Sequence, residues 1–454
     1  MRTNSRVRQL RSVLIEIALD DSQVAARALR RVGAHMPASL VFGRRFAEAR
    51  ELLLRSERWD RAECQNWIAE RLARATEALP EDPEAPEWPQ WLNLPARRTV
   101  TRDELSSAPD RFLRETFTGR TRTISTGGTG GKPAFLKIDP AASSAEWAYM
   151  QRMWERYGYR RRDRRLVLRG LPLKDGRPVS YDPLLAELRV SPFRLGGPWR
   201  KAIEADVRSF KPRFVHGYPS AVERLAEIWR GPLPRIEALF LASETLTTER
   251  WDRFEEEWQA PVLSWYGHSE KQALGGNCPG NRAFHMFPTY GLSEIITDGR
   301  RQAEAGEFGT IVATGFVSEA LKIVRYETGD VARFVGWGCE SCGMDWPLID
   351  SVTGRWGHDP LIGRHGVPIS MTALNFHSSV FEGIRRLRYV QEHRGRAELL
   401  LEVDELGDKE KRSIARAIRS KVGDELEVTL SRVDEIPLTP SGKHILVDQR
   451  INDR

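Results

Sequence analysis

The amino-acid sequence predicts an α/β protein with a large N-terminal α/β domain, which includes a helical N-terminal region, and a small C-terminal α+β domain joined to it by a hinge. Short apolar strand candidates alternate with amphipathic helix candidates between residues 124 and 354. Residues 1–117 carry apolar side chains at helical spacing, and a tail as long as a small domain follows Gly354-Arg355. We therefore expect one domain at 1–354, with 1–117 mainly helical and 118–354 as the α/β core, and a lid domain at 355–454.

Local patterns predict the elements in order. In the core, the strands are expected at 165–168, 214–216, 239–241, 262–265, 310–313 and 331–335, and helices at 221–229 and 247–258. In the tail, helices are expected at 372–382 and 409–422, and strands at 386–392, 398–403, 425–433 and 445–447. Alternating strands and helices imply a partly parallel sheet, so ligands are expected where its strands end.

The charge pattern does not favour a nucleic-acid partner. The net charge is +7, but the arginines are spread along the chain, and the densest run, at 160–165, has no interleaved aromatic side chains. A solvated basic face is the better interpretation. We expect no nucleic-acid partner.

No segment resembles a membrane span, because every apolar run is shorter than the ~20 residues that a spanning helix needs. The basic residues before 13–19 faintly resemble a secretory signal, but Glu16 interrupts the apolar part, which favours an amphipathic helix. The expected location is cytoplasmic, with no membrane partner. The oligomeric state is left open, with a homodimer as one candidate.

A glycine-rich loop with two threonines and a lysine precedes an apolar run. Glycines bring backbone N–H groups close to an anion, and hydroxyl and lysine side chains add donors, so a polyphosphate is the expected ligand. Pro133 follows the lysine where a P-loop needs Ser or Thr, which excludes that class of site; a flexible linker is the alternative. The phosphate-binding candidates are Thr126, Gly127, Gly128, Thr129, Gly130, Gly131 and Lys132.

Three of the four cysteines suggest a metal site. Cys339 and Cys342 form a CxxC knuckle between two glycines, and Cys278 and His285 lie on an earlier segment. Together they would supply the Cys3His set that closes a tetrahedral zinc site. A redox CxxC or unrelated reduced thiols are the alternatives, whereas Cys64 is expected to be a buried apolar residue.

Four further motifs occur in a fixed order along the chain. They are Tyr266-Gly267-His268-Ser269-Glu270, Tyr326-Glu327-Thr328-Gly329-Asp330, Gly354-Arg355 and Pro440-Ser441-Gly442-Lys443. With the glycine-rich loop, this series resembles the AMP-forming adenylating enzymes, the acyl-CoA synthetase and ligase superfamily. The likeness is to the phenylacetate-CoA ligase-like branch, including relatives associated with capsule-polysaccharide genes, and it spans residues 120–447.

The resemblance implies a role for each matching residue. The loop would hold the β- and γ-phosphates of ATP, and Arg355 would reach the ribose or phosphate. Asp330 would accept hydrogen bonds from the ribose hydroxyls. The adenine would be bordered by Ser243, Glu244, Tyr266, Gly267 and Ser269.

The same resemblance places the chemistry and the acyl pocket. Glu270 would ligate Mg²⁺, and Lys443 would contact the forming acyl-adenylate. The acyl pocket would be bordered by His216, Gly217, Tyr218 and Trp265, whose aromatic rings are compatible with an aryl or arylacetic acid. The Cys3His set resembles the zinc site of many members of this branch.

These residue types also suit the reaction on chemical grounds. A carboxylate that attacks the α-phosphate brings one anion against another, so Mg²⁺ at Glu270 and the ammonium of Lys443 would stabilise the developing charge. The loop departs from the family pattern, since Gly127 and Gly130 stand where hydroxyl residues are usual, which removes two donors worth about 1.5 to 3 kcal/mol each to a charged group.

The expected function is therefore that of an AMP-forming ligase. A carboxylic acid and Mg·ATP would give acyl-AMP and pyrophosphate, and coenzyme A would then accept the acyl group after rotation of the tail domain. One alternative transfers the acyl group to an amine or a carrier-protein thiol in polysaccharide or secondary-metabolite biosynthesis. Another is a catalytically inactive, zinc-stabilised nucleotide-binding protein.

Overall fold

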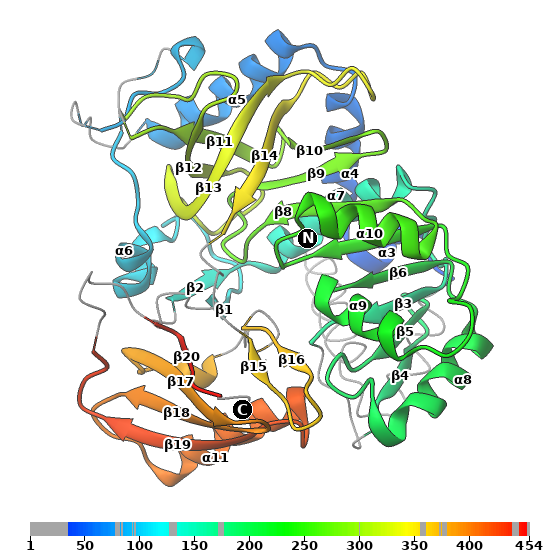
Figure 1. The fold of residues 1–454 in the computed structure, drawn as a ribbon. Helices are drawn as coiled ribbons and strands as arrows, with labels where there is room; N and C mark the ends of the chain where they lie inside the picture. Colours follow the sequence, from blue (N-terminus) through cyan, green and yellow to red (C-terminus); the bar gives the residue numbers. More distant parts are fainter. Residues whose placement is uncertain are drawn as a thin grey trace, which may run out of the picture.

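A twelve-stranded mixed sheet forms the centre of the larger domain in the computed structural model (Figure 1). The structure describes residues 35–77, 82, 85–92, 94, 97–126, 134–170, 177–298, 300–354, 360–371, 374, 379–437 and 445–451. The strand order is β11-β12-β13-β14-β10-β9-β8-β7-β6-β3-β5-β4. The strands are β3 (Arg165–Leu168), β4 (Val179–Asp182), β5 (Glu187–Val190), β6 (Phe214–Gly217), β7 (Ala238–Ala242), β8 (Val262–Gly267), β9 (Leu274–Cys278), β10 (Asn281–Met286), β11 (Gly291–Ile296), β12 (Phe308–Gly315), β13 (Tyr326–Trp337) and β14 (Pro347–Thr353).

One half of this sheet is parallel, as the alternating pattern predicted. Strands β8, β7, β6, β3 and β5 run in the same direction, whereas the other neighbouring pairs are antiparallel. The parallel strands are short and almost wholly buried, because helices cover both of their faces. Their carboxyl ends lie along one edge, at Leu168, Gly217, Ala242 and Gly267.

The two faces of the parallel half pack against different helices. Phe214 and Phe240 lie in one buried cluster with Trp154 of α7 (Pro140–Glu155), whereas Val215 and Leu239 lie in another cluster. That second cluster includes side chains of α8 (Arg200–Phe210), α9 (Pro219–Ile228) and α10 (Thr248–Trp258). The alternation follows from the two-residue period of a strand.

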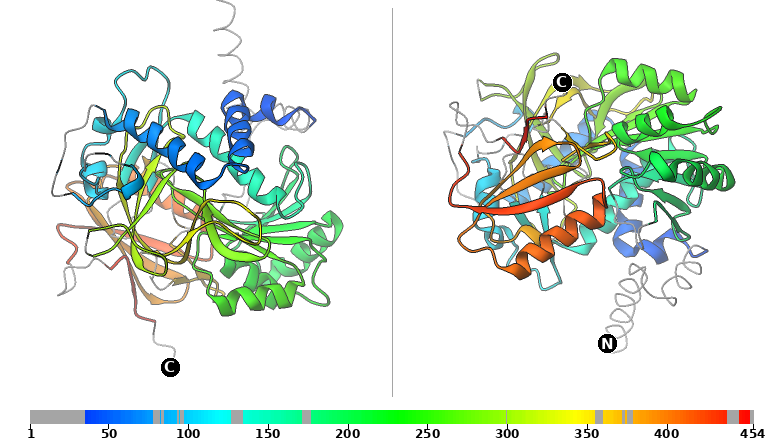
Figure 2. Two further views of the ribbon diagram at one scale, coloured as in Figure 1. Left: turned by 90° about the horizontal axis from the view of Figure 1, so that it is seen from above. Right: turned by 60° about the horizontal axis from the view of Figure 1, so that its bottom comes forward.

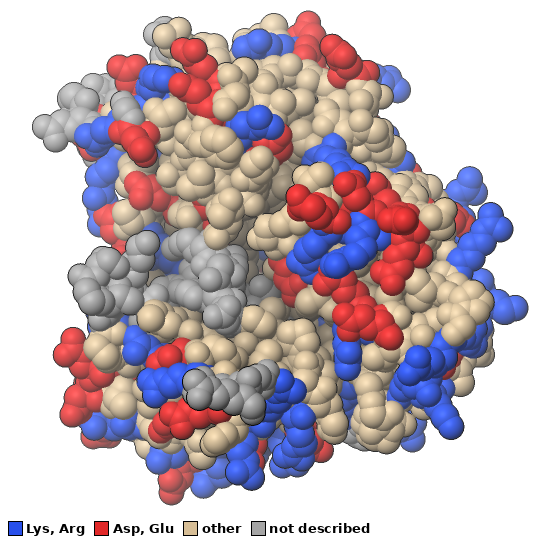
Figure 3. Space-filling model, in the orientation of Figure 1, with Lys and Arg blue, Asp and Glu red and all other residues tan. Residues whose placement is uncertain are grey.

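The surface of α9 and α10 carries paired charges. Glu223 binds Arg250 through two hydrogen bonds of 2.9 and 2.8 Å, and Arg282 contacts Asp252 and Glu255 at 2.6 and 2.9 Å. Figure 3 shows acidic and basic side chains interspersed over this part of the molecule. Such pairs on the surface contribute little stability each, about 0 to 1 kcal/mol.

The described part of the N-terminal region is mainly helical, as expected. It contains α3 (Ala38–Phe42), α4 (Arg44–Ser56), α5 (Arg61–Thr76), α6 (Arg102–Ser107) and the 3-10 turns η1 (Gln90–Leu92) and η2 (Pro109–Phe112). A capping box between Asp60 and Glu63 begins α5. Helix α4 packs against α7, and the ion pair between Arg50 and Glu155 joins them at 3.0 Å. The helix expected at 13–19 lies outside the described residues.

The C-terminal domain is a small α+β unit beneath the larger one (Figure 1). Its mixed sheet has the order β19-β18-β17-β20, and α11 (Asp408–Val422) packs on one face through Ile414 and Ile418 (Figure 2). The strands are β17 (Arg386–His393), β18 (Arg396–Glu402), β19 (Glu427–Val433) and β20 (Val447–Gln449), preceded by the hairpin β15 (Leu361–Ile362) and β16 (Pro368–Ile369).

The helix expected at 372–382 was wrong where it can be compared. The structure describes residues 374 and 379–382 of that range, and they contain the 3-10 turn η5 (Ser379–Phe381). The boundary at 354 and 355 stays a prediction, because 355–359 lie outside the described residues. Within the part of the chain that the structure describes, we find no helix with the length and apolarity needed to cross a bilayer.

Candidate active site

The glycine-rich loop connects two paired strands. Strands β1 (Arg122–Thr126) and β2 (Ala134–Ile138) are antiparallel, and Thr126 is the register partner of Ala134. The two ends of the loop are therefore held side by side, and the apolar run that follows the loop forms β2. The loop residues Gly127, Gly128, Thr129, Gly130, Gly131 and Lys132 and the side chain of Thr126 lie outside the described residues, as do Arg355 and Lys443.

Two motifs that are far apart in the sequence meet at a buried carboxylate. Glu270, which follows β8, is 6% exposed. Its Oε1 accepts a hydrogen bond from the Tyr326 hydroxyl at 2.9 Å, and its Oε2 lies 3.2 Å from His268 Nδ1. Burial opposes ionisation, but the hydrogen bond with His268 and the electrostatic interactions with His268 and Arg102 outweigh it and lower the pKa of Glu270 to about 2. The site thus keeps an ionised carboxylate out of contact with most of the solvent.

A second contact joins the same two motifs. The Tyr266 hydroxyl donates to Asp330 Oδ2 at 2.9 Å, and the Asp330 backbone N–H donates to the Thr328 hydroxyl at 3.1 Å. Burial and the Asp330 charge raise the pKa of Tyr266 well above its ordinary value, so it acts as a hydrogen-bond donor. Gly329 has a φ of +75°, which permits the turn that presents Asp330.

Three residues of this cluster had no assigned role in the sequence prediction. His268 and Tyr326 belong to motifs that resembled the family. Tyr326 contacts Glu270 across 56 residues of chain, whereas His268 lies two residues before Glu270. Rings of Tyr266 and Tyr326 lie 6.1 and 5.9 Å from that of His268. Arg102 begins α6, more than 150 residues earlier in the sequence, and no local pattern marked it as a neighbour of Glu270.

Ser243 and Glu244 follow β7 at the same edge of the sheet. Ser243 has a φ of +72°, an unusual conformation for a residue other than glycine, and it is exposed. The Glu244 carboxylate accepts hydrogen bonds from the Ser220 backbone N–H at 2.9 Å and hydroxyl at 2.7 Å. It therefore caps the first turn of α9, where the helix dipole favours a negative charge.

The residues expected to border the acyl pocket lie at the carboxyl ends of β6 and β8. His216 is buried between the rings of Trp154 and Trp265, each 5.5 Å away. Gly217 is required by close packing, because a Cβ there would lie 2.8 Å from the Leu168 carbonyl oxygen. Tyr218 lines a shallow recess that is also lined by Phe193 and by Pro368 of the β16 strand. The structure thus brings three of the four predicted residues together around one sheet edge and places Tyr218 beside the hairpin of the C-terminal domain.

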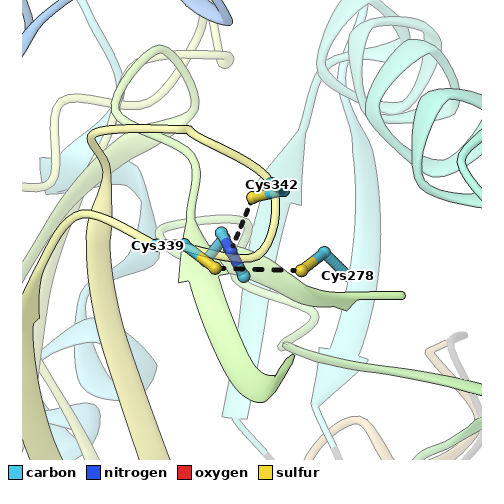
Figure 4. Close-up of side chains that lie close together, drawn as sticks. Cys278, Cys339 and Cys342 are labelled. Atoms are coloured by element: carbon cyan, nitrogen blue, oxygen red, sulfur yellow. Dashed lines mark hydrogen bonds between the residues drawn. The ribbon is translucent and has the colours of Figure 1, made fainter. Parts of the chain in front are cut away.

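The predicted metal ligands come together in space. The candidate ligand atoms of Cys278, His285, Cys339 and Cys342 all lie within 4.8 Å of one another. Cys278 Sγ is 3.9 Å from Cys339 Sγ, and Cys342 Sγ is 3.3 Å from His285 Nε2. Figure 4 shows the three thiol side chains directed toward one another, with Cys278 on β9 and with Cys339 and Cys342 on one loop.

The donor set fits a zinc ion. His285 Nδ1 contacts the Ala283 carbonyl oxygen at 3.1 Å, which leaves Nε2 directed at the thiols, as in metal sites where a carbonyl fixes the histidine tautomer. Burial lowers the pKa of His285 to about 4, so the ring is neutral and able to ligate. A CxxC redox pair would not need Cys278 and His285 at the same point, so the geometry favours the metal interpretation over the redox alternative. Cys64 is buried elsewhere, as expected.

Comparisons with known proteins give a distant match. No protein-family model matches the chain. The phenylacetate-coenzyme A ligase of Thermus thermophilus is 26% identical over 270 residues, which are 52% of this chain and 60% of that relative. The match thus spans about three fifths of the relative's length.

Solved structures agree on the fold. The chain is similar to 2-hydroxyisobutyryl-CoA ligase in complex with 2-HIB-AMP and CoA in the thioesterification state, with a TM-score of 0.51 and 21% identity. This likeness covers 87% of the chain and 92% of the ligase. An open conformation of the same ligase gives a TM-score of 0.43. The first likeness confirms the predicted fold class, a large α/β domain followed by a small α+β domain.

Proposed function

Because the chain belongs to the superfamily of adenylate-forming acyl-CoA ligases, as its motifs indicated, we propose that it activates a carboxylic acid with Mg·ATP and transfers the acyl group to coenzyme A. The observation that supports this best is the meeting of Glu270 and Tyr266 with Tyr326 and Asp330 at one sheet edge. These buried hydrogen bonds bring the two separated motifs together beside the carboxyl end of β8, where ligands of such sheets bind.

The first step forms one bond and breaks another at the same phosphorus. A carboxylate oxygen of the acid attacks the α-phosphorus of ATP, and the bond from that phosphorus to the bridging oxygen breaks as pyrophosphate leaves. The anionic Glu270 would hold Mg²⁺, which protein sites often bind through one carboxylate and the phosphates of the substrate. Mg²⁺ supplies charge at the developing pentacovalent centre, and Lys443 would add a second cation there.

The nucleotide would lie over the cluster that Tyr266 and Asp330 form. Asp330 would accept from the ribose hydroxyls, and Tyr266 with Ser243 and Glu244 would border the adenine. The loop from Thr126 to Lys132 would donate to the phosphates, because its ends are paired beside this edge of the sheet. Arg355 would contact the ribose or phosphate from the segment that joins the two domains.

The second step would transfer the acyl group to a thiol. The sulfur of coenzyme A attacks the acyl carbon, and AMP leaves with the oxygen that joined it to the acid. The wall formed by Trp265, His216 and Trp154 is compatible with an aryl or arylacetic acid. The Cys3His cluster would bind a structural zinc ion, because it joins β9 and β10 to the knuckle before β14 and leaves no open ligand position.

Pyrophosphate release over a panel of carboxylic acids tests the proposal. We expect acid-dependent release that needs Mg²⁺, and trapping of the acyl-adenylate by hydroxylamine. Glu270→Gln should reduce turnover by about 100-fold, as removal of one charge-stabilising group does in other enzymes, whereas the exposed Glu410→Gln should not. If pyrophosphate release with every acid equals the rate without acid, adenylation is refuted. If a product forms with an amine but not with coenzyme A, the acceptor is an amine.

A further inference from the structure

Among the described residues of the acyl region, a ring nitrogen of His216 is buried without a hydrogen-bond partner, as are Nε1 of Trp154 and two nitrogens of Arg165 beside it. The Nδ1 atom of His216 is inaccessible to solvent and makes no hydrogen bond to any of the described residues. The whole residue is 5% exposed. A buried donor or acceptor without a partner costs about 1 to 3 kcal/mol, so such atoms in native proteins call for an explanation.

His216 lies next to the sheet edge where ligands are expected. The residue is the penultimate one of β6, next to the carboxyl edge where ligands of such sheets bind. Trp265 of β8 and Trp154 of α7 flank its ring, and the Arg165 guanidinium lies 4.1 Å above the Trp154 ring. Arg165 is itself buried and paired with Glu187, so its charge is already balanced.

The histidine is uncharged in this setting. Burial, followed by the positive charges of Arg169 and Arg165, lowers the pKa of His216 well below its ordinary value. A neutral imidazole offers one N–H donor and one acceptor nitrogen. It therefore matches an uncharged oxygen substituent better than a second carboxylate.

On these grounds, and resting on the proposed function, we propose that His216 hydrogen-bonds an uncharged oxygen substituent, a hydroxyl or a carbonyl, on the acyl part of the carboxylic acid. His216 is then a specificity-determining residue that selects oxygenated acids over their unsubstituted counterparts. The aromatic rings would bury the carbon skeleton, and the imidazole between them would hydrogen-bond the substituent. A site built to hydrogen-bond such a group rejects the analogue that lacks it, because the protein atom is then left unpaired.

Matched acid pairs test this inference. Pyrophosphate release is measured for phenylacetate against 2-, 3- and 4-hydroxyphenylacetate and mandelate, within a wider panel of carboxylic acids. We expect at least one hydroxylated acid to exceed phenylacetate by about 10- to 100-fold in kcat/KM. His216→Leu should remove that advantage, so that both acids of a pair react with similar kcat/KM, whereas His216→Asn, which keeps polar atoms at this position, should retain part of it.

Two controls separate specificity from structure. Trp265→Phe alters the same wall without removing the polar group, so it should change both acids of a pair by a similar factor. The thermal midpoint of ligand-free His216→Leu should equal or exceed that of the wild type, because no hydrogen bond is lost. A large fall in that midpoint, with equal loss for both acids, would make His216 structural and overturn the inference.

The outcomes also distinguish the inference from the proposed function. If the wild-type protein releases pyrophosphate equally with hydroxylated and unsubstituted acids, the proposed ligase function stands and the selection by His216 is refuted. A preference that persists in His216→Leu would do the same. Absence of release with every acid would refute the ligase itself, and the inference with it.

Discussion

Replacement of His268 by leucine tests how the site keeps Glu270 ionised. His268 Nδ1 lies 3.2 Å from Glu270 Oε2, and the carboxylate is 6% exposed. Leucine fills much of the same volume but donates no hydrogen bond. Glu270 would then depend on Tyr326 and Arg102 to offset the cost of burial.

The pKa of Glu270 sets the size of the effect. Burial acts against the charge, yet the interactions of the site lower this pKa from 4.5 to about 2. A pKa that is about 2.5 lower in the folded than in the unfolded state corresponds to about 3 kcal/mol of folding free energy at neutral pH. Loss of one hydrogen bond to a charged group accounts for about 1.5 to 3 kcal/mol. We therefore expect His268→Leu to lower the free energy of unfolding by about 2 kcal/mol at pH 7.

The direction of the pH dependence follows from the lowered pKa. A carboxylate whose pKa is lower in the folded state contributes its full stability above the unfolded value of 4.5, and loses it as the pH falls toward about 2. The variant has a higher Glu270 pKa in the folded state, so it has less of this stability to lose. The difference between wild type and variant should therefore shrink between pH 4.5 and pH 2.

Urea titration at several pH values, followed by tryptophan fluorescence, measures the effect. The exposed His393→Leu is the matched control and should leave the unfolding free energy within about 0.5 kcal/mol of the wild type. Equal stability of His268→Leu and wild type at pH 7 would show that His268 does not hold the carboxylate. A difference that stays constant from pH 7 to pH 3 would show that the effect does not act through the ionisation of Glu270.

Three further perturbations test other parts of the molecule. Asp330→Asn should raise the KM for ATP about 10-fold and abolish any discrimination against 2′-deoxy-ATP, whereas unchanged discrimination would exclude a ribose contact. Cys342→Ser should reduce the zinc content of the protein, measured by mass spectrometry, and lower its thermal midpoint. Replacement of the buried Cys64 by serine should leave the zinc content unchanged. Equal zinc content in the two variants would refute the metal site. Arg325→Met should cost about 3 to 5 kcal/mol, because it leaves the fully buried Glu294 without its 2.8 Å partner. In the wild type, the effect of burial on Glu294 is larger than that of the Arg325 charge and raises the pKa of Glu294 to about 7. Wild-type stability should therefore fall as the pH rises from 4.5 to 7. In the variant, this fall should extend above pH 7. A variant profile that runs parallel to that of the wild type would contradict this account.

Much of the architecture could be predicted because it depends on neighbours in the chain. The strand at 165–168 was placed to the residue, and α10 begins one residue after the expected Thr247, which caps it. Apolar runs and their two- or 3.6-residue periods report which face is buried, and burial is what stabilises each element. The helix prediction for 372–382 failed because the apolar spacing there resembles that of a helix, although the described part forms only a 3-10 turn.

Part of the candidate site could also be predicted from sequence, since the motifs marked Glu270, Tyr266 and Asp330 as ligand-binding types. The hydrogen bonds that these residues make with one another and with Tyr326 could not be predicted from sequence. The Tyr326 contact with Glu270 depends on the register of β12 and β13, which shifts between Thr310 and Val312, and a bulge of this kind has no clear local signal.

The same distinction applies to the metal and acyl regions. Residue types and spacing marked the four candidate metal ligands in the sequence, and the fold brings their ligand atoms within 4.8 Å of one another. The neighbours of His216 could not be identified in that way, since Trp154 comes from a helix packed on the sheet and Trp265 from another strand. Short-range patterns report which surfaces are buried, whereas the partners that meet there are chosen by strand order and side-chain packing across the whole domain, and these long-range contacts leave no periodic trace in the chain.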